Sequence, residues 1–170
     1  MNFLRVTSLA TALIGAGLAA ASSASAQIVA LGHSAVHGPG GDLSQMWPAQ
    51  LEGMLHAKGS NVHITNAGVY GETTGEELAR VSSAVPDGTK TVILAINGHN
   101  DTRRNITPAV AAANIAAIKS QLKARGIRII DAMGIYVSVW KQPGMLLSDG
   151  VHLNVDGNRK VATILAGTVR

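Results

Sequence analysis

Apolar residues occur along the chain in two alternating patterns. Short continuous runs are typical of buried strands, whereas segments with an apolar residue at every third or fourth position are typical of helices. The runs predict four strands, at residues 28–31, 62–65, 91–96 and 127–130. The helical spacing, with Thr74 and Glu77 as a capping box and Gly126 as a stop, predicts helices over residues 47–55, 74–85, 108–122 and about 156–169. Residues 134–148 fit neither pattern, and a short extra strand at 136–139 is one interpretation.

The alternation of strands and helices favours an α/β fold. A helix that follows each strand carries the chain back to the edge where the next parallel strand begins. Such helices cover both faces of the sheet. We therefore expect a small doubly wound, flavodoxin-like, three-layer sandwich. In such folds the ligand lies beyond the carboxyl ends of the strands, which makes the residues after each strand the ones to inspect.

The first 26 residues have the parts of a secretory signal peptide. Arg5 precedes an apolar run from Val6 to Ala21, and the small residues Ala24 and Ala26 mark a cleavage site. A membrane anchor is the weaker interpretation, because the run is shorter than the roughly 20 residues that a spanning helix needs. We predict a signal peptide at 1–26, a domain at 27–170 with no membrane span of its own, and a periplasmic or secreted bacterial protein.

Composition excludes several functions. The absence of cysteine excludes a disulfide scaffold, a zinc ribbon and a cysteine nucleophile. The net charge of +4 is too mild, and the 14% of charged residues too few, to indicate a nucleic-acid partner. A small-molecule substrate is the remaining expectation, and the composition says nothing about the oligomeric state.

Polar or glycine-rich segments follow three of the predicted strands and precede the last helix. They contain Ser34, the segment Asn66-Ala67-Gly68, Asn100 and the pair Asp149 and His152. A serine hydroxyl becomes a good nucleophile when a histidine removes its proton, and the histidine is best oriented by a carboxylate. Asp149 and His152 are three residues apart, so one loop can present both. The backbone amides of Ser34 and Gly68, with the Asn100 side chain, are candidates to stabilise an oxyanion.

These four segments together resemble the SGNH hydrolases, also called the GDSL family of esterases, lipases and thioesterases. The family has a serine after the first strand, a glycine after the second, a G-x-N-D block after the third and D-x-x-H near the end. Ser34, Gly68, Gly98-x-Asn100-Asp101 and Asp149-x-x-His152 match them in order. The resemblance implies that Ser34 is the nucleophile, His152 the general base and Asp149 its orienting partner. It also implies an oxyanion hole made by Ser34, Gly68 and Asn100.

Two features depart from the family pattern. The family reads Gly-Asp-Ser where this chain has Gly32-His33-Ser34, and His33 either disturbs the serine or replaces the contacts of the aspartate through its ring nitrogens. In addition, residues 127–149 are too few for the further strand and helix that family members usually have. We therefore expect a trimmed, mostly parallel sheet of about four strands with the fourth at an edge.

Other residues near the strand ends have simpler interpretations. His33 and His37 are only two ligands, so we expect no metal site, and the resemblance implies no cofactor. His33, His99 and Trp140 are expected to line or modulate the pocket, whereas Trp47 is more typical of a core residue.

The sequence thus predicts an exported serine hydrolase that cleaves small-molecule carboxylic esters, and the shortness of the chain favours small acyl groups. Two alternatives remain open. One is a catalytically weak or inactive binding protein on the same scaffold, because of His33. The other is an unrelated flavodoxin-like binding domain, for which the loop after Ser34 is a poor phosphate-binding loop.

Overall fold

A sheet of four parallel strands forms the centre of the molecule. The structure is a computed structural model that describes residues 27–169; the predicted signal peptide therefore lies outside the described residues. The strand order is β2-β1-β3-β4, with β4 at one edge as expected. The strands are β1 (Gln27–Gly32), β2 (His63–Gly68), β3 (Thr91–Ala95) and β4 (Arg128–Asp131).

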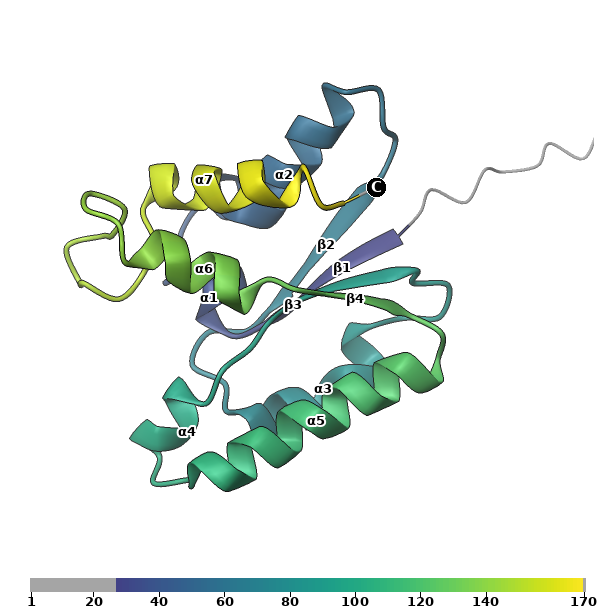
Figure 1. Ribbon diagram of the computed structural model, residues 1–170, viewed down its shortest axis with the longest axis vertical. Coiled ribbons are helices and arrows are strands. Elements are labelled where there is room, and N and C mark those ends of the chain that lie inside the picture. The colour runs from purple at the N-terminus through teal and green to yellow at the C-terminus, as the bar shows by residue number, and fades with distance from the viewer. Residues whose placement is uncertain (1–26, 170) are drawn as a thin grey trace, which may run out of the picture.

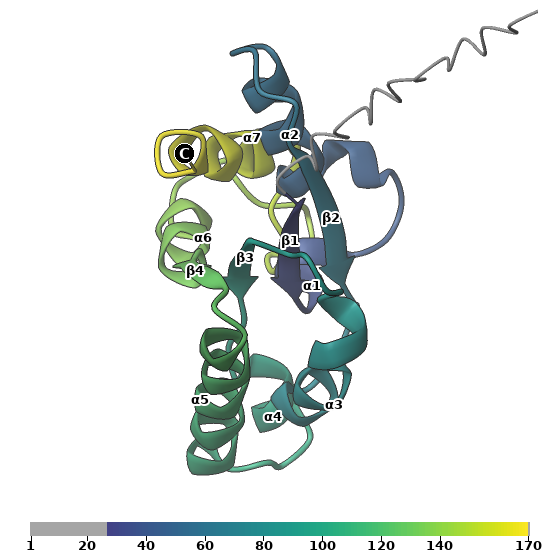
Figure 2. The same cartoon turned by 90° about the vertical axis from the view of Figure 1, so that its right-hand side faces the viewer.

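Helices cover both faces of this sheet (Figures 1 and 2). Residues of β1 alternate between the two cores, because successive side chains of a strand point to opposite faces. Ile28 and Ala30 pack with the helices on one face, and Val29 and Leu31 with those on the other. The first group is α1 (Ser34–His37), α2 (Trp47–His56), α6 (Met133–Trp140) and α7 (Val155–Leu165), and the second is α3 (Thr74–Ala84), α4 (His99–Arg103) and α5 (Pro108–Ala124).

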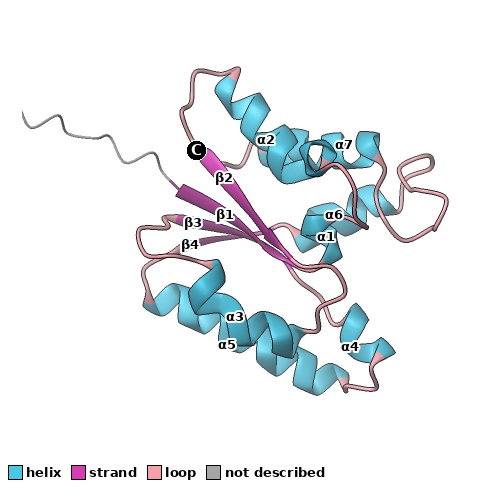
Figure 3. Cartoon of the chain, turned by 180° about the vertical axis from the view of Figure 1, so that it is seen from behind, coloured by secondary structure: helices cyan, strands magenta, loops and turns pink. Residues whose placement is uncertain are grey.

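The doubly wound, three-layer fold and its short parallel sheet are confirmed (Figure 3). The interpretation of 136–139 as an extra strand is wrong, because this segment belongs to α6. Tyr136 and Val139 are both buried against the sheet, and burial of one helical face outweighs the strand preference of β-branched residues. No helix within residues 27–169 is both long and apolar enough to cross a membrane.

Helix α3 begins at Thr74 as predicted, but its capping box lies one residue earlier in the sequence. Thr73 is the N-cap, and its side chain accepts a hydrogen bond from the Glu76 amide while the Glu76 carboxylate accepts one from the Thr73 amide. Thr74 and Glu77, the pair expected from the sequence, are instead completely buried. The sequence offers both Thr-x-x-Glu pairs, and the structure selects the one that leaves the cap carboxylate exposed.

The carboxyl ends of the strands converge on one end of the molecule. In Figure 1 this is the left side, where α1, α4 and the loop between α6 and α7 lie together. That loop carries Asp149 and His152, α1 begins at Ser34, and α4 contains Asn100. The fold therefore brings together residues that are more than 100 positions apart in the sequence.

Candidate active site

Asp149 and His152 form a closely coupled pair in the loop before α7. The His152 Nδ1 atom lies 2.6 Å from Asp149 Oδ2. Asp149 Oδ1 accepts hydrogen bonds from the backbone amides of Val151 and His152, which fix the carboxylate in place. These bonds, first that of the His152 amide and then that of its side chain, lower the pKa of Asp149 to about 2. An ionised Asp149 holds the proton on Nδ1, so Nε2 of a neutral His152 is free to accept one.

Ser34 is the first residue of α1, directly after the central strand β1. Ser34 and His152 both line the cavities at the carboxyl end of the sheet. Within the described chain, neither the hydroxyl nor the backbone amide of Ser34 has a hydrogen-bond partner. Both groups are thus available to a substrate, and catalytic hydrogen bonds of this kind often tighten only in the complex.

His33 replaces the aspartate of the family block with two contacts of its own. Its Nδ1 atom accepts a hydrogen bond from the Ala35 amide at 3.2 Å, which caps α1. Its Nε2 atom then carries the hydrogen and donates to Asn97 Oδ1, also at 3.2 Å. Burial lowers the pKa of His33 to about 4, so the ring is neutral near pH 7. Of the two expectations for His33, the structure favours replacement of the aspartate contacts over disturbance of Ser34.

The expectation for Gly68 needs correction. Gly68 is the last residue of β2, and its amide donates to Asn66 Oδ1 at 3.0 Å. A Cβ at this position would collide with the backbone of His37, so this glycine allows α1 to pack closely on β2. Gly68 does not line either cavity that contains Ser34.

Gly71, three residues later, lies in the cavity instead. It has a φ of 76°, in the left-handed region that glycine adopts without steric cost. Its amide has no hydrogen-bond partner among residues 27–169, and its carbonyl accepts from the Arg104 guanidinium at 2.9 Å. The sequence contains both glycines, and only the path of the turn after β2 distinguishes the one that faces the site.

Asn100 lines the same cavity from α4. One hydrogen of its side-chain amide is donated to the Glu72 carbonyl at 2.8 Å, which leaves the second for a ligand. The next residue, Asp101, is fully buried and accepts from the amide and hydroxyl of Thr74. Asp101 therefore joins α4 to the start of α3 and does not face the cavity.

A partly buried ion pair connects the turns that carry these groups. Arg80 binds the Glu72 carboxylate with two nitrogens and donates to the Gly32 carbonyl at 3.2 Å. The Glu72 carbonyl in turn accepts from Asn100. The chain of contacts reaches from the turn before Ser34 to the side chain of Asn100. Sequence patterns did not reveal it because its two ends join residues 48 and 28 positions apart.

Two cavities share Ser34 and His152 in their lining. The first, called here the apolar chamber, has a volume of about 280 Å³. The second, the polar chamber, has a volume of about 330 Å³. Both are lined by Ser34, His99, Val151 and His152; the apolar chamber adds His33, Ala35, Asn97, Tyr136, Val137, Trp140 and Lys141, and the polar chamber adds Tyr70, Gly71, Asn100, Arg103 and Arg104.

The two tryptophans differ in their placement. Trp140 lines the apolar chamber, and its indole nitrogen donates to the Val151 carbonyl at 2.9 Å. Trp47 is fully buried in the core, where its indole nitrogen donates to the Ala35 carbonyl at 2.8 Å. Trp47 thus supports α1 from behind, whereas Trp140 forms a wall of the site.

Comparisons with known proteins identify relatives of this chain. A family described as GDSL-like lipase/acylhydrolase matches residues 30–147. An arylesterase of Vibrio mimicus is 32% identical over 113 residues, which cover 66% of this chain and 56% of the relative. Esterase TesA of Pseudomonas aeruginosa is 27% identical over 108 residues, covering 64% and 54%. The matches thus span little more than half the length of these curated relatives.

The fold has the same relatives. The crystal structure of a TesA superimposes with a TM-score of 0.72 and 21% identity, over 85% of this chain and 98% of that one. The two chains therefore share a fold.

Proposed function

Because this chain belongs to the GDSL-like lipase/acylhydrolase family, we propose that it is a serine hydrolase that cleaves carboxylic esters. The observation that carries the proposal is that His152, paired with Asp149, lines the same cavity as Ser34, whose hydroxyl has no hydrogen-bond partner among residues 27–169. Nucleophile, base and orienting carboxylate are the three parts that acyl transfer through a serine requires.

In the proposed first step, Ser34 Oγ attacks the carbonyl carbon and His152 Nε2 accepts the hydroxyl proton. The tetrahedral intermediate collapses, the bond to the leaving oxygen breaks, and His152 gives its proton to that oxygen. Water then attacks the acyl-enzyme, again losing its proton to His152, and the acid is released with regeneration of the Ser34 hydroxyl. Asp149 stabilises the imidazolium that forms in each half of the cycle.

Three donors are proposed to hold the oxyanion. They are the amides of Ser34 and Gly71 and the free side-chain hydrogen of Asn100, which all line the polar chamber. None of these hydrogens has a partner in the described part of the chain, so they are ready to bind the charge as it develops. Gly71 here takes the role that the sequence suggested for Gly68.

The apolar chamber is proposed to bind the less polar half of the ester, a short acyl or an aryl group. Its volume of about 280 Å³ fits such a group, and residues 27–169 contain no further strand and helix that would extend it. Export to the periplasm or the medium remains our proposal from the sequence of residues 1–26. No step of the proposed cycle calls for a cofactor.

The hydrolysis of a short-chain p-nitrophenyl ester tests this proposal. With the protein that begins at Gln27, we expect turnover that falls about a thousandfold or more in Ser34→Ala. Ser120→Ala is the matched control, because Ser120 is exposed on α5 away from the site, and it should leave the rate unchanged.

His33→Asp decides between the active enzyme and the inactive binding protein on the same scaffold. Since His33 already caps α1, we expect the parent protein to be active without this substitution. A parent that is inert and a His33→Asp variant that turns over the ester would contradict the proposal and support the silenced scaffold.

A further inference from the structure

The polar chamber has an unusual charge distribution. Its lining residues include the two arginines Arg103 and Arg104 and no Asp or Glu among the described residues. A cavity lined by one sign of charge raises the local concentration of an oppositely charged ligand.

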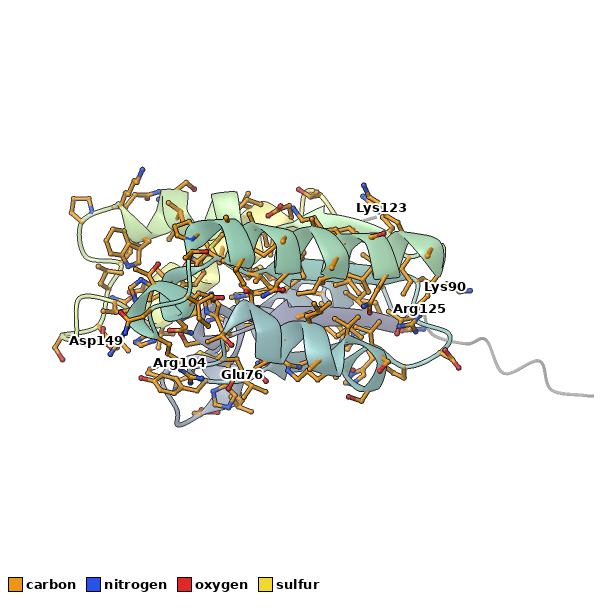
Figure 4. The ribbon with its side chains drawn as sticks, turned by 90° about the horizontal axis from the view of Figure 1, so that it is seen from below. Glu76, Lys90, Arg104, Lys123, Arg125 and Asp149 are labelled. Carbon is orange, nitrogen blue, oxygen red and sulfur yellow. The ribbon has the colours of Figure 1, made fainter. Side chains whose placement is uncertain are left out.

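The carboxylates around the site are all held by other groups. Glu72 is bound to Arg80, Asp149 to His152, and the buried Asp101 to Thr74. Glu76 binds Arg104 with both oxygens, at 2.9 and 3.0 Å, and Figure 4 shows these two side chains at the same end of the molecule as Asp149. None of them neutralises Arg103.

Arg103 differs from its neighbour in this respect. Arg104 is occupied by Glu76 and by the Gly71 carbonyl, so it serves to fix the turn that carries Gly71. Arg103 is exposed at the end of α4, and within residues 27–169 its guanidinium makes neither a hydrogen bond nor an ion pair. Five donors on a planar group match the oxygens of a carboxylate or a phosphate.

We propose that Arg103 makes the enzyme selective for esters that carry an anionic group on the half of the substrate lying in the polar chamber. The other half of such an ester, short and apolar, lies against Trp140 and Val137 in the apolar chamber. The substrate class is thus an ester that joins an apolar group to a carboxylate- or phosphate-bearing group. This inference rests on the proposed ester hydrolysis.

Two pairs of isosteric esters test the selectivity and show which half carries the charge. The first pair is 4-acetoxybenzoate and 4-acetoxybenzamide, which differ only in the charge of the leaving group. The second is mono-4-nitrophenyl glutarate and its terminal amide, which differ only in the charge of the acyl group. The quantity compared is the ratio of kcat/KM for the anionic ester to that for the neutral one.

For at least one pair of esters, we expect this ratio to fall about three- to tenfold in Arg103→Gln. It should fall further in Arg103→Glu, which reverses the charge, and should be largely kept in Arg103→Lys, which retains it. High salt should reduce the ratio of the parent protein in the same direction. Lys123→Gln removes one charge at the opposite end of the molecule (Figure 4) and should not change it. Lys141→Gln removes one charge from the apolar chamber and should change it less than Arg103→Gln does.

The results separate this inference from the proposed function. Neutral esters hydrolysed in a Ser34-dependent manner, with ratios that Arg103→Gln leaves unchanged in both pairs, would overturn the selectivity alone. An equal effect of Lys123→Gln would also overturn it, because the effect would then reflect total charge. Absence of Ser34-dependent turnover on all four esters would overturn the ester hydrolase and the selectivity together.

Discussion

Glu77 is the residue whose environment is most at odds with its chemistry. Its carboxyl is completely buried in α3, and neither oxygen has a hydrogen-bond partner among the described residues. Burial first, and then the nearby charge of Glu72, raise its pKa to about 9. The group is therefore neutral in the folded protein near pH 7, although it ionises with its ordinary value of 4.5 in the unfolded chain.

This difference makes the stability of the protein depend on pH. The stability associated with Glu77 is fully present below pH 4.5 and is lost as the pH rises toward 9, because only the unfolded chain gains from releasing the proton. We expect Glu77→Gln to become more stable relative to the parent by about 1 kcal/mol per pH unit between pH 5 and pH 8. Denaturant unfolding at several pH values measures this difference.

The control variant is Asp87→Asn, which removes one exposed carboxylate. Its free energy of unfolding is compared with that of the parent at the same pH values. If the free energy of unfolding of Glu77→Gln differed from that of the parent by the same amount at pH 5 and pH 8, the burial argument would be wrong.

His33 is a buried base, so its effect on stability has the opposite dependence on pH. Burial lowers its pKa, so its stabilising contribution is present above about pH 6.5 and is lost as the pH falls toward 4. The sequence identified His33 as a departure from the family pattern but could not decide its effect. The effect of His33 depends on the two hydrogen bonds of its ring, one with the Ala35 amide and one with the Asn97 side chain. The second bond joins residues 64 positions apart, so the sequence does not reveal it.

At the scale of elements, the strands were predictable and the turns were not. The four strands follow from continuous apolar runs, and β1 and β3 are buried on both faces. The edge position of the fourth follows from the few residues between it and Asp149, which leave no room for another crossover and strand. Helix α6 was missed because its run of β-branched and aromatic residues has no helical period that sequence alone distinguishes from a strand. Gly71 was missed because glycine after β2 occurs at two positions, and only the turn geometry decides which one lines the cavity.

The Arg80–Glu72 pair acts between elements and gives a prediction at that scale. Since it links the Gly32 carbonyl to the turn that holds Asn100, we expect Arg80→Met to lower kcat about tenfold or more with a smaller effect on KM. The double variant with Glu72→Gln should recover stability, because no buried carboxylate is left unpaired, without recovering kcat. Steady-state kinetics and denaturant unfolding measure the two effects.

Arg159→Met is the matched control for this ion pair. Arg159 forms an exposed pair with Asp156 on α7, and its loss should leave kcat unchanged. A kcat of Arg80→Met equal to that of the parent would show that the pair stabilises the fold without positioning the site.

At the scale of the whole molecule, the proposed catalytic groups and a cluster of basic residues lie at opposite ends of the sheet. The proposed catalytic groups lie at the carboxyl ends of the strands, whereas Lys90, Lys123 and Arg125 lie at the opposite end (Figure 4). Two cavities of different polarity share Ser34 and His152 in their lining, and we propose that the two halves of an ester lie in one cavity each. A sheet of only four strands is enough to place every part of this site, because each proposed catalytic segment follows a strand or precedes the last helix.

The proposed mechanism requires an activated Ser34 hydroxyl, and a fluorophosphonate probe detects such a hydroxyl by reacting with it. The probe forms a covalent adduct only with an activated hydroxyl, so we expect one adduct per chain, mapped to Ser34 by mass spectrometry. The adduct should be absent in Ser34→Ala and strongly slowed in His152→Gln, in which no base accepts the proton. An unlabelled Ser34 in the folded parent protein, or an adduct at another serine, would contradict the account.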